Sequence, residues 1–334
     1  MLETVYRSFF IENGAVRHFR RVTMKAQLVI PEREEIKKEK FNLHSKNVKE
    51  NIFAYCMLAP DVIGLAVFFF LPIIIALYTS FHSWNVLEPM QFIGLDNYKT
   101  MISDTQWWIS VRNTLLYSVM FVPMVFCFSL LMAIFVNSIP GRAQQLFRTL
   151  FFIPYAISTV VASLIWRFML DPQRGFVNEL FEMFGIPPQG FLGNPKQALF
   201  CIALISAWML IGYYCIIFLS ALKDIPISYY EAAKLDGANA FHIFINITFP
   251  LLKEVSTFVL VVTTIASFQV FDLIKILTNG GPAGATNVSV YFIYQNAFEF
   301  MKVGYSSALA FVLFLIIFVI SLLQLKLTKG ETNV

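Results

Sequence analysis

The chain has 334 residues, of which 57% are hydrophobic and only 14% are charged, and 36 of them are phenylalanine. Soluble domains carry about a quarter charged residues. Long apolar runs account for the difference here, which excludes a large soluble core and predicts an all-α polytopic membrane protein. The formal net charge of +4 equals the balance of residues 1–50 alone, which hold 11 Lys and Arg against 7 Asp and Glu.

Residues 1–50 form a polar, basic N-terminal tail in which residues 31–40 mix both charges at helical spacing. A basic tail beside membrane spans is more often an anchor near anionic lipid than a nucleic-acid-binding arm. We therefore expect a cytoplasmic tail and no nucleic-acid partner. Glu3 and Glu12 interrupt any apolar run near the start, so no cleaved signal peptide is predicted, and Met24 offers an alternative start.

Six apolar segments follow within residues 51–330, each long enough to cross a lipid bilayer as a helix. Their orientation is predicted from Lys and Arg, because cytoplasmic loops carry an excess of both. One side holds 18 of these residues and includes both ends of the chain and the loops 137–148 and 223–253, whereas the other side holds 5. We therefore expect both termini in the cytoplasm. The six predicted spans are 53–81, 114–136, 149–170, 199–222, 256–277 and 303–325.

The loop 223–252, between the fourth and fifth predicted spans, has a pattern of its own. The run 231–236, Glu-Ala-Ala-Lys-Leu-Asp, favours a helix, and Gly237 favours a turn because glycine accepts left-handed backbone angles. A second amphipathic run, 241–245, follows, and we expect Pro250 to close it. A loop that only joins two spans has to be polar and needs no structure of its own. This one predicts helix, turn and helix with a mixed surface, as a docking site for a partner would have.

The spacing in this loop resembles the coupling loop of the permease subunits of ATP-binding-cassette (ABC) importers. The matching pattern is Glu231-Ala232-Ala233, three residues, Gly237, nine residues, Ile247, one residue, and Phe249-Pro250, where the family usually has Leu-Pro. A plain interfacial helical hairpin is the simpler alternative. Because the spacing matches over 20 positions and lies between two predicted spans, we favour the coupling loop.

Four further motifs extend the resemblance over residues 53–325. Three are similar to the sugar-importer branch of the family, and the fourth is similar to its first permease subunit, the maltose- and glycerol-phosphate type. The motifs are Ser80-Phe81-x-x-Trp84, Gly94-Leu95-x-Asn97-Tyr98, Arg112-Asn113-Thr114 and Thr278-x-Gly280-Gly281-Pro282.

The resemblance implies a subunit of the bacterial inner membrane that works with a second permease subunit, two ATPase subunits and an extracytoplasmic solute-binding protein. It also implies that Glu231 makes polar contacts with the ATPase, that Ala232 and Ala233 pack closely, and that Gly237 forms the turn. Asp236 is a further candidate for ATPase coupling. The chain has no Gly-x-x-x-x-Gly-Lys-Ser/Thr phosphate loop. We therefore expect ATP and Mg²⁺ on the partner ATPase, and no cofactor on this chain.

Candidate substrate contacts come from polar residues of the fifth predicted span. Gln269, Asp272 and Lys275 recur every three residues and so share one face of a helix. Polar groups inside spans are costly and therefore often functional, although Asp272 and Lys275 also suit a simple ion pair with each other. Sugars are bound by planar polar groups and aromatic rings, so the neighbouring candidates are Phe268, Phe271, Tyr291 and Tyr294, with Arg167 and Asn296 as lesser ones.

No catalytic motif is present, and the four cysteines and four histidines show no metal-binding spacing. The sequence thus predicts a non-enzymatic permease subunit of an ATP-driven, binding-protein-dependent importer of an oligosaccharide or a related sugar or polyol, neutral or acidic. The main alternative is a secondary transporter driven by an ion gradient, but it predicts an inverted repeat that we do not find. A membrane enzyme or scaffold needs a catalytic cluster or a large soluble domain. An ABC exporter often carries a fused ATPase.

Overall fold

The computed structural model describes residues 50–329, so the predicted tail 1–50 lies outside the described part except for its last residue. Within that part, strands are limited to β1 (His82–Ser83) and β2 (Gln91–Phe92), which pair antiparallel with His82 opposite Phe92. The remainder is helix and connecting turns, which confirms the all-α prediction. The chain divides into two compact units, Met1–Pro72 and Ile73–Val334.

The first long helix runs over Glu50–Ser80 and includes the π-helical turn η1 (Ala66–Phe70) and α4 (Leu71–Ser80). The further helices of the second unit, in chain order, are α5 (Asp96–Ser103), α6 (Thr105–Ser138), α7 (Gly141–Ala156), α8 (Thr159–Met169), α9 (Phe176–Met183), η2 (Phe191–Gly193), α10 (Ala198–Asp224), α11 (Ile227–Leu235), α12 (Ala240–Ile243), η3 (Phe244–Thr248), α13 (Phe249–Leu251), α14 (Lys253–Phe268), α15 (Asp272–Leu277), α16 (Ser289–Tyr294), η4 (Gln295–Glu299) and α17 (Val303–Lys329).

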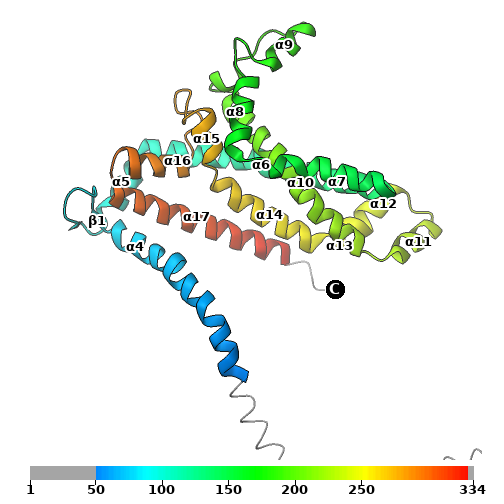
Figure 1. Cartoon of the computed structure of the whole chain (residues 1–334), viewed down its shortest axis with the longest axis horizontal. Helices are drawn as coiled ribbons and strands as arrows, with labels where there is room; N and C mark the ends of the chain where they lie inside the picture. Colours follow the sequence, from blue (N-terminus) through cyan, green and yellow to red (C-terminus); the bar gives the residue numbers. More distant parts are fainter. Residues whose placement is uncertain (1–49, 330–334) are drawn as a thin grey trace, which may run out of the picture. The chain divides into compact units, whose positions relative to one another are not determined.

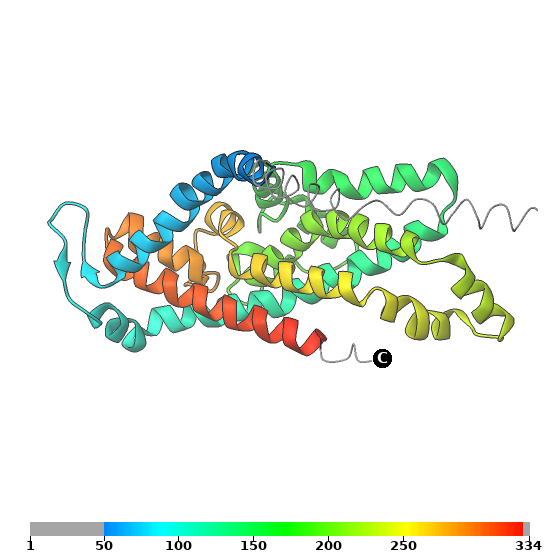
Figure 2. The same ribbon diagram turned by 90° about the horizontal axis from the view of Figure 1, so that it is seen from below.

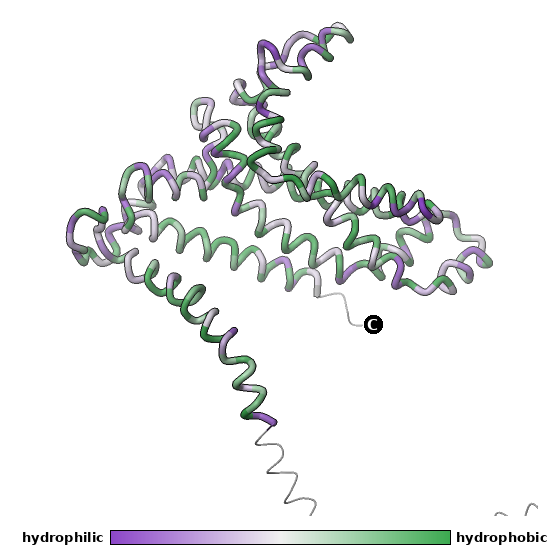
Figure 3. Tube along the Cα trace, viewed as in Figure 1, coloured by the Kyte–Doolittle hydropathy of each residue, from purple (hydrophilic) through white to green (hydrophobic). Residues whose placement is uncertain are grey.

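Four described helices are long and apolar enough to cross a membrane: Glu50–Ser80, α6, α10 and Val303–Thr328 of α17. They correspond to the first, second, fourth and sixth predicted spans. Two further candidates are bent pairs, α7 with α8 at 91°, and Ala240–Leu251 with α14 at 69°. Six spans result only if each bent pair crosses once. Figure 3 shows that apolar residues dominate α14 and α17, whereas polar residues gather near helix ends and in the connecting turns.

The third predicted span, 149–170, is not one straight helix. Pro154 lacks the N–H that would bond one turn back, and α7 ends two residues later at Ala156. Ile157 has extended backbone angles, and α8 starts at Thr159. The break therefore lies after Pro154, whereas apolar length alone predicted a continuous span.

The fifth predicted span, 256–277, is also wrong in its outer third. Helix α14 ends at Phe268, and a separate short helix, α15, begins at Asp272. Neither Gly nor Pro lies between them, so the sequence carries no breaker signal there. Phe271 departs from helical geometry with φ −138° and ψ −60°, and it packs against the main hydrophobic core.

Helices α6 and α10 pack together along much of their length, and α14 and α17 lie side by side (Figures 1 and 2). The core between α6 and α10 includes the fully buried Phe121, Ile202 and Phe218. Hydroxyl groups also join helices: Ser267 donates to Ser118 at 2.7 Å, and Ser129 donates to the Ile211 carbonyl at 3.1 Å. Such bonds stabilise helix packing within a bilayer, because no water is present there as an alternative partner.

Candidate functional site

The predicted helix–turn–helix of the loop 223–252 is present in the structure. Helix α11 ends in a Schellman motif, in which the Gly237 N–H bonds to the Lys234 carbonyl at 3.1 Å and the Ala238 N–H bonds to the Ala233 carbonyl at 2.9 Å. Gly237 has a φ of +79°, the left-handed angle that glycine accepts most readily. The Asn239 side chain then caps α12 by accepting from the His242 N–H at 2.9 Å.

Pro250 does not close the second run, contrary to the sequence-based expectation. The helix continues through α12, η3 and α13, and Pro250 lies near the start of α13. In η3 the Phe249 N–H bonds five residues back, to the Phe244 carbonyl, so the helix widens by one residue just before the proline. The chain bends only at Leu252, whose side chain is fully buried, and α14 follows at 69° to the preceding helix.

The surface of this segment combines polar and large apolar side chains. Glu231, Ala232, Asp236 and Gly237 are exposed, and Ala233 is half-buried. Beside them Leu235 is 89% exposed, Ile227 72% and Phe241 67%. Grouped exposed apolar side chains next to polar ones are typical of interaction sites. We call residues 223–252 the coupling segment from here on.

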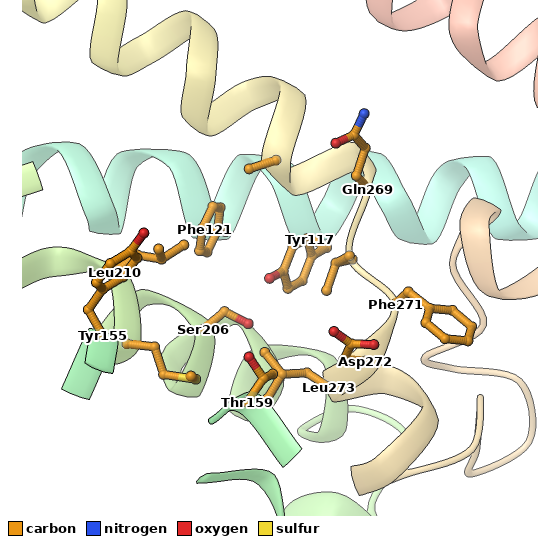
Figure 4. Close-up of a pocket in the computed structure, with 13 residues that line it drawn as sticks. Tyr117, Phe121, Tyr155, Thr159, Ser206, Leu210, Gln269, Phe271, Asp272 and Leu273 are labelled. Atoms are coloured by element: carbon orange, nitrogen blue, oxygen red, sulfur yellow. The ribbon is translucent and has the colours of Figure 1, made fainter. Parts of the chain in front are cut away.

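A cavity of about 240 Å³ lies where the break between α7 and α8 and the gap between α14 and α15 meet α6 and α10. Its lining includes Thr159 at the start of α8 and residues 269–273 between α14 and α15. Tyr117 of α6 is only 1% exposed, and Ser206 of α10 is also buried. Figure 4 shows the hydroxyls of Tyr117, Ser206 and Thr159 and the carboxylate of Asp272 turned toward a common space.

The predicted substrate residues fall into two groups. Gln269, Phe271 and Asp272 line this central cavity, although the Gln269 amide points away from the hydroxyl groups (Figure 4). Helix α14 ends at Phe268 and α15 begins at Asp272, so one continuous helix does not carry Gln269, Asp272 and Lys275. The prediction that these three residues share one helix face is therefore wrong. Phe268 is buried in a second core cluster together with α17 residues.

Lys275 pairs with Glu299, not with Asp272. Its Nζ lies 2.8 Å from the Glu299 carboxylate, and it lies 5.0 Å from the ring centroid of Tyr294 and 5.5 Å from that of Tyr291. The hydrogen bond between the two groups raises the pKa of Lys275 and lowers that of Glu299. The Tyr291 hydroxyl bonds to Asn279 at 2.9 Å. This cluster braces the turn after α15.

Asn296 and Arg167 also lie outside the lining of the central cavity. Asn296 is buried, and its side-chain N–H donates to the Phe292 carbonyl one turn back at 2.9 Å, which is a local structural contact. Arg167 donates to the Ile276 carbonyl at 3.3 Å and so joins α8 to α15.

The sequence analysis missed Tyr117, Tyr155, Thr159 and Ser206 of the cavity lining. Each is a hydroxyl-bearing residue within an apolar run, and that is the signal that marks them. They were missed because each lies on a different helix. No sequence spacing shows that residues on four separate helices meet in the fold.

The fold and the two sites define a polytopic membrane transport subunit with a helical docking segment and a polar cavity among its spans. Residues 126–331 match the family described as the binding-protein-dependent transport system inner membrane component. The probable ABC transporter permease protein PH1215 of Pyrococcus horikoshii is 34% identical over 278 residues, which cover 82% of this chain and 95% of that protein. The arabinooligosaccharides transport system permease protein AraP of Bacillus subtilis is 33% identical over 282 residues, or 83% and 90% of the two chains.

The fold has a counterpart among solved structures. A bacterial alginate ABC transporter, in complex with an alginate pentasaccharide-bound periplasmic protein, contains a chain that superposes with a TM-score of 0.77 at 23% identity. The match covers 86% of this chain and 98% of that chain. The chain described here belongs to the family of binding-protein-dependent ABC permeases. This confirms the family predicted from the Glu-Ala-Ala motif, and it removes the support for an ion-driven secondary transporter.

Proposed function

We propose that this permease imports a neutral oligosaccharide or a related polyol through a pathway that includes the central cavity. Four hydroxyl-bearing side chains line that cavity, together with the Asp272 carboxylate and the aromatic rings of Phe121 and Phe271. Sugars present hydroxyl groups and flat apolar faces, and such a lining complements both. AraP, a relative named for arabinooligosaccharides, supports the substrate class.

The charge of the cavity favours a neutral substrate over an acidic one. Asp272 is the single ionisable acid among its described lining residues, and none of those residues is Lys or Arg. A carboxylate substrate would meet a like charge without a compensating cation, which is costly away from bulk water. The proposal therefore differs from the alginate transporter, whose bound pentasaccharide is an acidic polysaccharide fragment.

The cavity is somewhat smaller than most small-molecule sites, which measure about 300–1,000 Å³. That size suits one half of a pathway completed by a second permease subunit. We propose a heterodimeric pathway with both termini of this chain in the cytoplasm, two ATPase subunits on that side and a solute-binding protein on the other. The excess of Lys and Arg on one side supports this orientation, and the complex of the alginate transporter with its periplasmic protein supports the last partner.

The coupling segment is proposed to transmit the ATPase motion. Its exposed Leu235, Ile227 and Phe241 would be buried in the partner, and its two helices are joined by a fully bonded turn. Helix α14 continues from the segment to the central cavity, where it ends at Phe268. A push on the segment would therefore pass through the bend at Leu252 into α14 and reach the cavity wall at the end of that helix. ATP and Mg²⁺ are expected on the ATPase.

Uptake by proteoliposomes tests the proposed function. The complete transporter is reconstituted with its binding protein, and ATP-dependent accumulation is measured for neutral and uronic-acid oligosaccharides of equal length. We expect accumulation of a neutral sugar that requires ATP and persists when ion gradients are collapsed. Accumulation of only the acidic series would refute the neutral-substrate proposal, and loss of uptake with the ion gradient would refute ATP coupling.

A further inference from the structure

A second cleft of about 470 Å³ lies near the starts of α6 and α10, at the end of α10 away from the coupling segment. Residues of α6, residues around the start of α10, and the loop 283–285 form its walls. Two basic side chains line it, Arg112 and Lys196, and no Asp or Glu is among its described lining residues. We call it the basic cleft.

Both cations are available to a ligand. Arg112 and Lys196 are exposed, and neither side chain has a hydrogen bond or ion pair within residues 50–329. They also belong to the small group of 5 Lys and Arg on the side of the chain predicted to face outward. Since positive charge is disfavoured there, two basic residues meeting in one cleft call for a functional explanation.

In the walls formed by α6 and by the start of α10, apolar side chains follow the basic residue along the chain. Arg112, Leu116 and Met120 are spaced by four residues on α6, so the Arg112 cation lies at one end of an apolar helix face. Lys196 lies in the turn just before α10, and Phe200 belongs to the first turn of that helix. Leu116 remains 44% exposed and Phe200 48%. The cleft is thus cationic at its outer end and apolar toward the middle of the spans.

The third wall of the basic cleft, the loop 283–285, is tied to α6 by hydrogen bonds. Asn113 of α6 is buried, and its side-chain N–H group donates to the Gly284 and Asn287 carbonyls, each at 3.0 Å. The neighbouring Thr114 hydroxyl donates to Ser289 at 3.0 Å and accepts from the Ser289 N–H at 2.8 Å. These bonds tie the loop to α6, so the cleft is formed before any ligand arrives.

We propose that the basic cleft binds an anionic phospholipid of the outer leaflet, with its phosphate between Arg112 and Lys196 and an acyl chain along Leu116 and Phe200. The cations complement a phosphate, and the apolar side chains beside them complement a hydrocarbon chain. A soluble anion would contact only the cations. The proposal depends on membrane insertion in the predicted orientation, and it is independent of which solute is transported.

Lipid titration of the full-length chain, purified in mild detergent with its accompanying subunits, tests the site. Native mass spectrometry counts bound phosphatidylglycerol, with phosphatidylcholine as the zwitterionic comparison. We expect the double variant Arg112→Gln/Lys196→Gln to bind phosphatidylglycerol about 30-fold more weakly, since each basic residue near an anionic surface is worth about fivefold. The matched control Arg174→Gln/Lys302→Gln loses the same charge on the same predicted side and should change binding by less than about twofold.

The charge-preserving variant Arg112→Lys/Lys196→Arg should retain phosphatidylglycerol binding, which separates lost charge from lost folding. Equal phosphatidylglycerol affinity in wild type and the double glutamine variant would overturn the site. Displacement of the lipid by inorganic phosphate at an equal concentration would overturn the lipid assignment and point to a soluble anion. Sugar uptake is a separate readout, so failure here leaves the proposed function standing.

Discussion

At the scale of single residues, the central cavity depends on hydroxyl groups that are expensive to bury. Tyr117 is 1% exposed and lies beside Ser206 and the cavity. A buried phenol is tolerated when its hydroxyl has a partner; Ser206 supplies one, and under the proposed function a transported sugar would supply another. The sequence predicted Gln269, Phe271 and Asp272 for this region because they lie together in the chain. It did not predict Tyr117 or Ser206, because their proximity depends on how α6 packs against α10.

Tyr117→Phe is predicted to raise the sugar concentration that gives half-maximal uptake about fivefold, which corresponds to one lost hydrogen bond of about 1 kcal/mol. The phenyl ring keeps the packing, so the amount of inserted protein should not change. Tyr98→Phe is the matched control, since the Tyr98 hydroxyl bonds to Ser80 at 2.7 Å and is not part of the cavity lining. Unchanged transport in Tyr117→Phe would exclude this hydroxyl from substrate binding.

The ion pair between Lys275 and Glu299 predicts a specific pH dependence. The pKa of Glu299 is lowered by Lys275, so its stabilising contribution is present above the unfolded pKa and is lost as the pH falls through the folded pKa. The pKa of Lys275 is raised, so its contribution persists until strongly alkaline pH. Thermal denaturation should therefore separate wild type from Glu299→Gln at neutral pH, and the difference should shrink progressively as the pH falls below the ordinary pKa range of glutamate. A constant difference between the two proteins across this pH range would contradict the assigned pair.

At the scale of secondary-structure elements, breaks in helices were harder to predict than helices. The turn after α11 has a local cause in Gly237. The bend between α7 and α8 comes at Ile157 and Ser158, after Pro154 and outside the turn that its missing N–H affects. The gap between α14 and α15 has neither Gly nor Pro, and packing of Phe271 in the core accompanies it. Apolar periodicity predicts a membrane span, but it cannot predict a helix break that results from packing against neighbouring helices.

Substitutions at Gly237 should follow the cost of its left-handed turn. Gly237→Asn should be mild because asparagine tolerates a φ of +79° better than other residues. Gly237→Ala should cost about 1 kcal/mol of local stability, although space for its Cβ is open. Gly237→Pro cannot adopt the angle and loses the N–H that bonds to Lys234. We expect ATP-driven uptake to fall in that order, to near zero for proline, with equal amounts of inserted protein; normal uptake by the proline variant would remove the mechanical role of the turn.

The contact between α7 and α10 should tolerate no side chain at Gly212. A Cβ there would lie 1.7 Å from the Phe151 carbonyl oxygen, which belongs to the backbone and cannot rotate away. Gly212→Ala should therefore lower the free energy of unfolding by about 1–3 kcal/mol, seen as a lower thermal midpoint in detergent. Ser220→Ala, at an exposed position of the same helix, serves as the control. Equal midpoints for Gly212→Ala and wild type would show that the helices separate easily.

At the scale of the whole molecule, the proposed function requires partner subunits. The described residues of this chain supply a polar cavity and an exposed coupling segment, and the sequence holds no phosphate loop to bind ATP. Composition and the Glu-Ala-Ala spacing were enough to predict the family. The arrangement of the cavity required the packing of four helices, which no single sequence pattern contains.

Co-purification tests the central claim, that this permease is driven by an ATPase held at the coupling segment. The tagged chain is isolated from its native cells in mild detergent, and ATP hydrolysis and accompanying subunits are measured for wild type and for Leu235→Glu. Leu235 is 89% exposed, so the substitution should not disturb folding, whereas a buried unpaired carboxylate would cost several kcal/mol at an interface. Wild type should carry a second permease and ATPase activity, and Leu235→Glu should keep the permease but lose the ATPase. A wild-type chain that purifies without an ATPase, or a variant that keeps all of it, would contradict the claim.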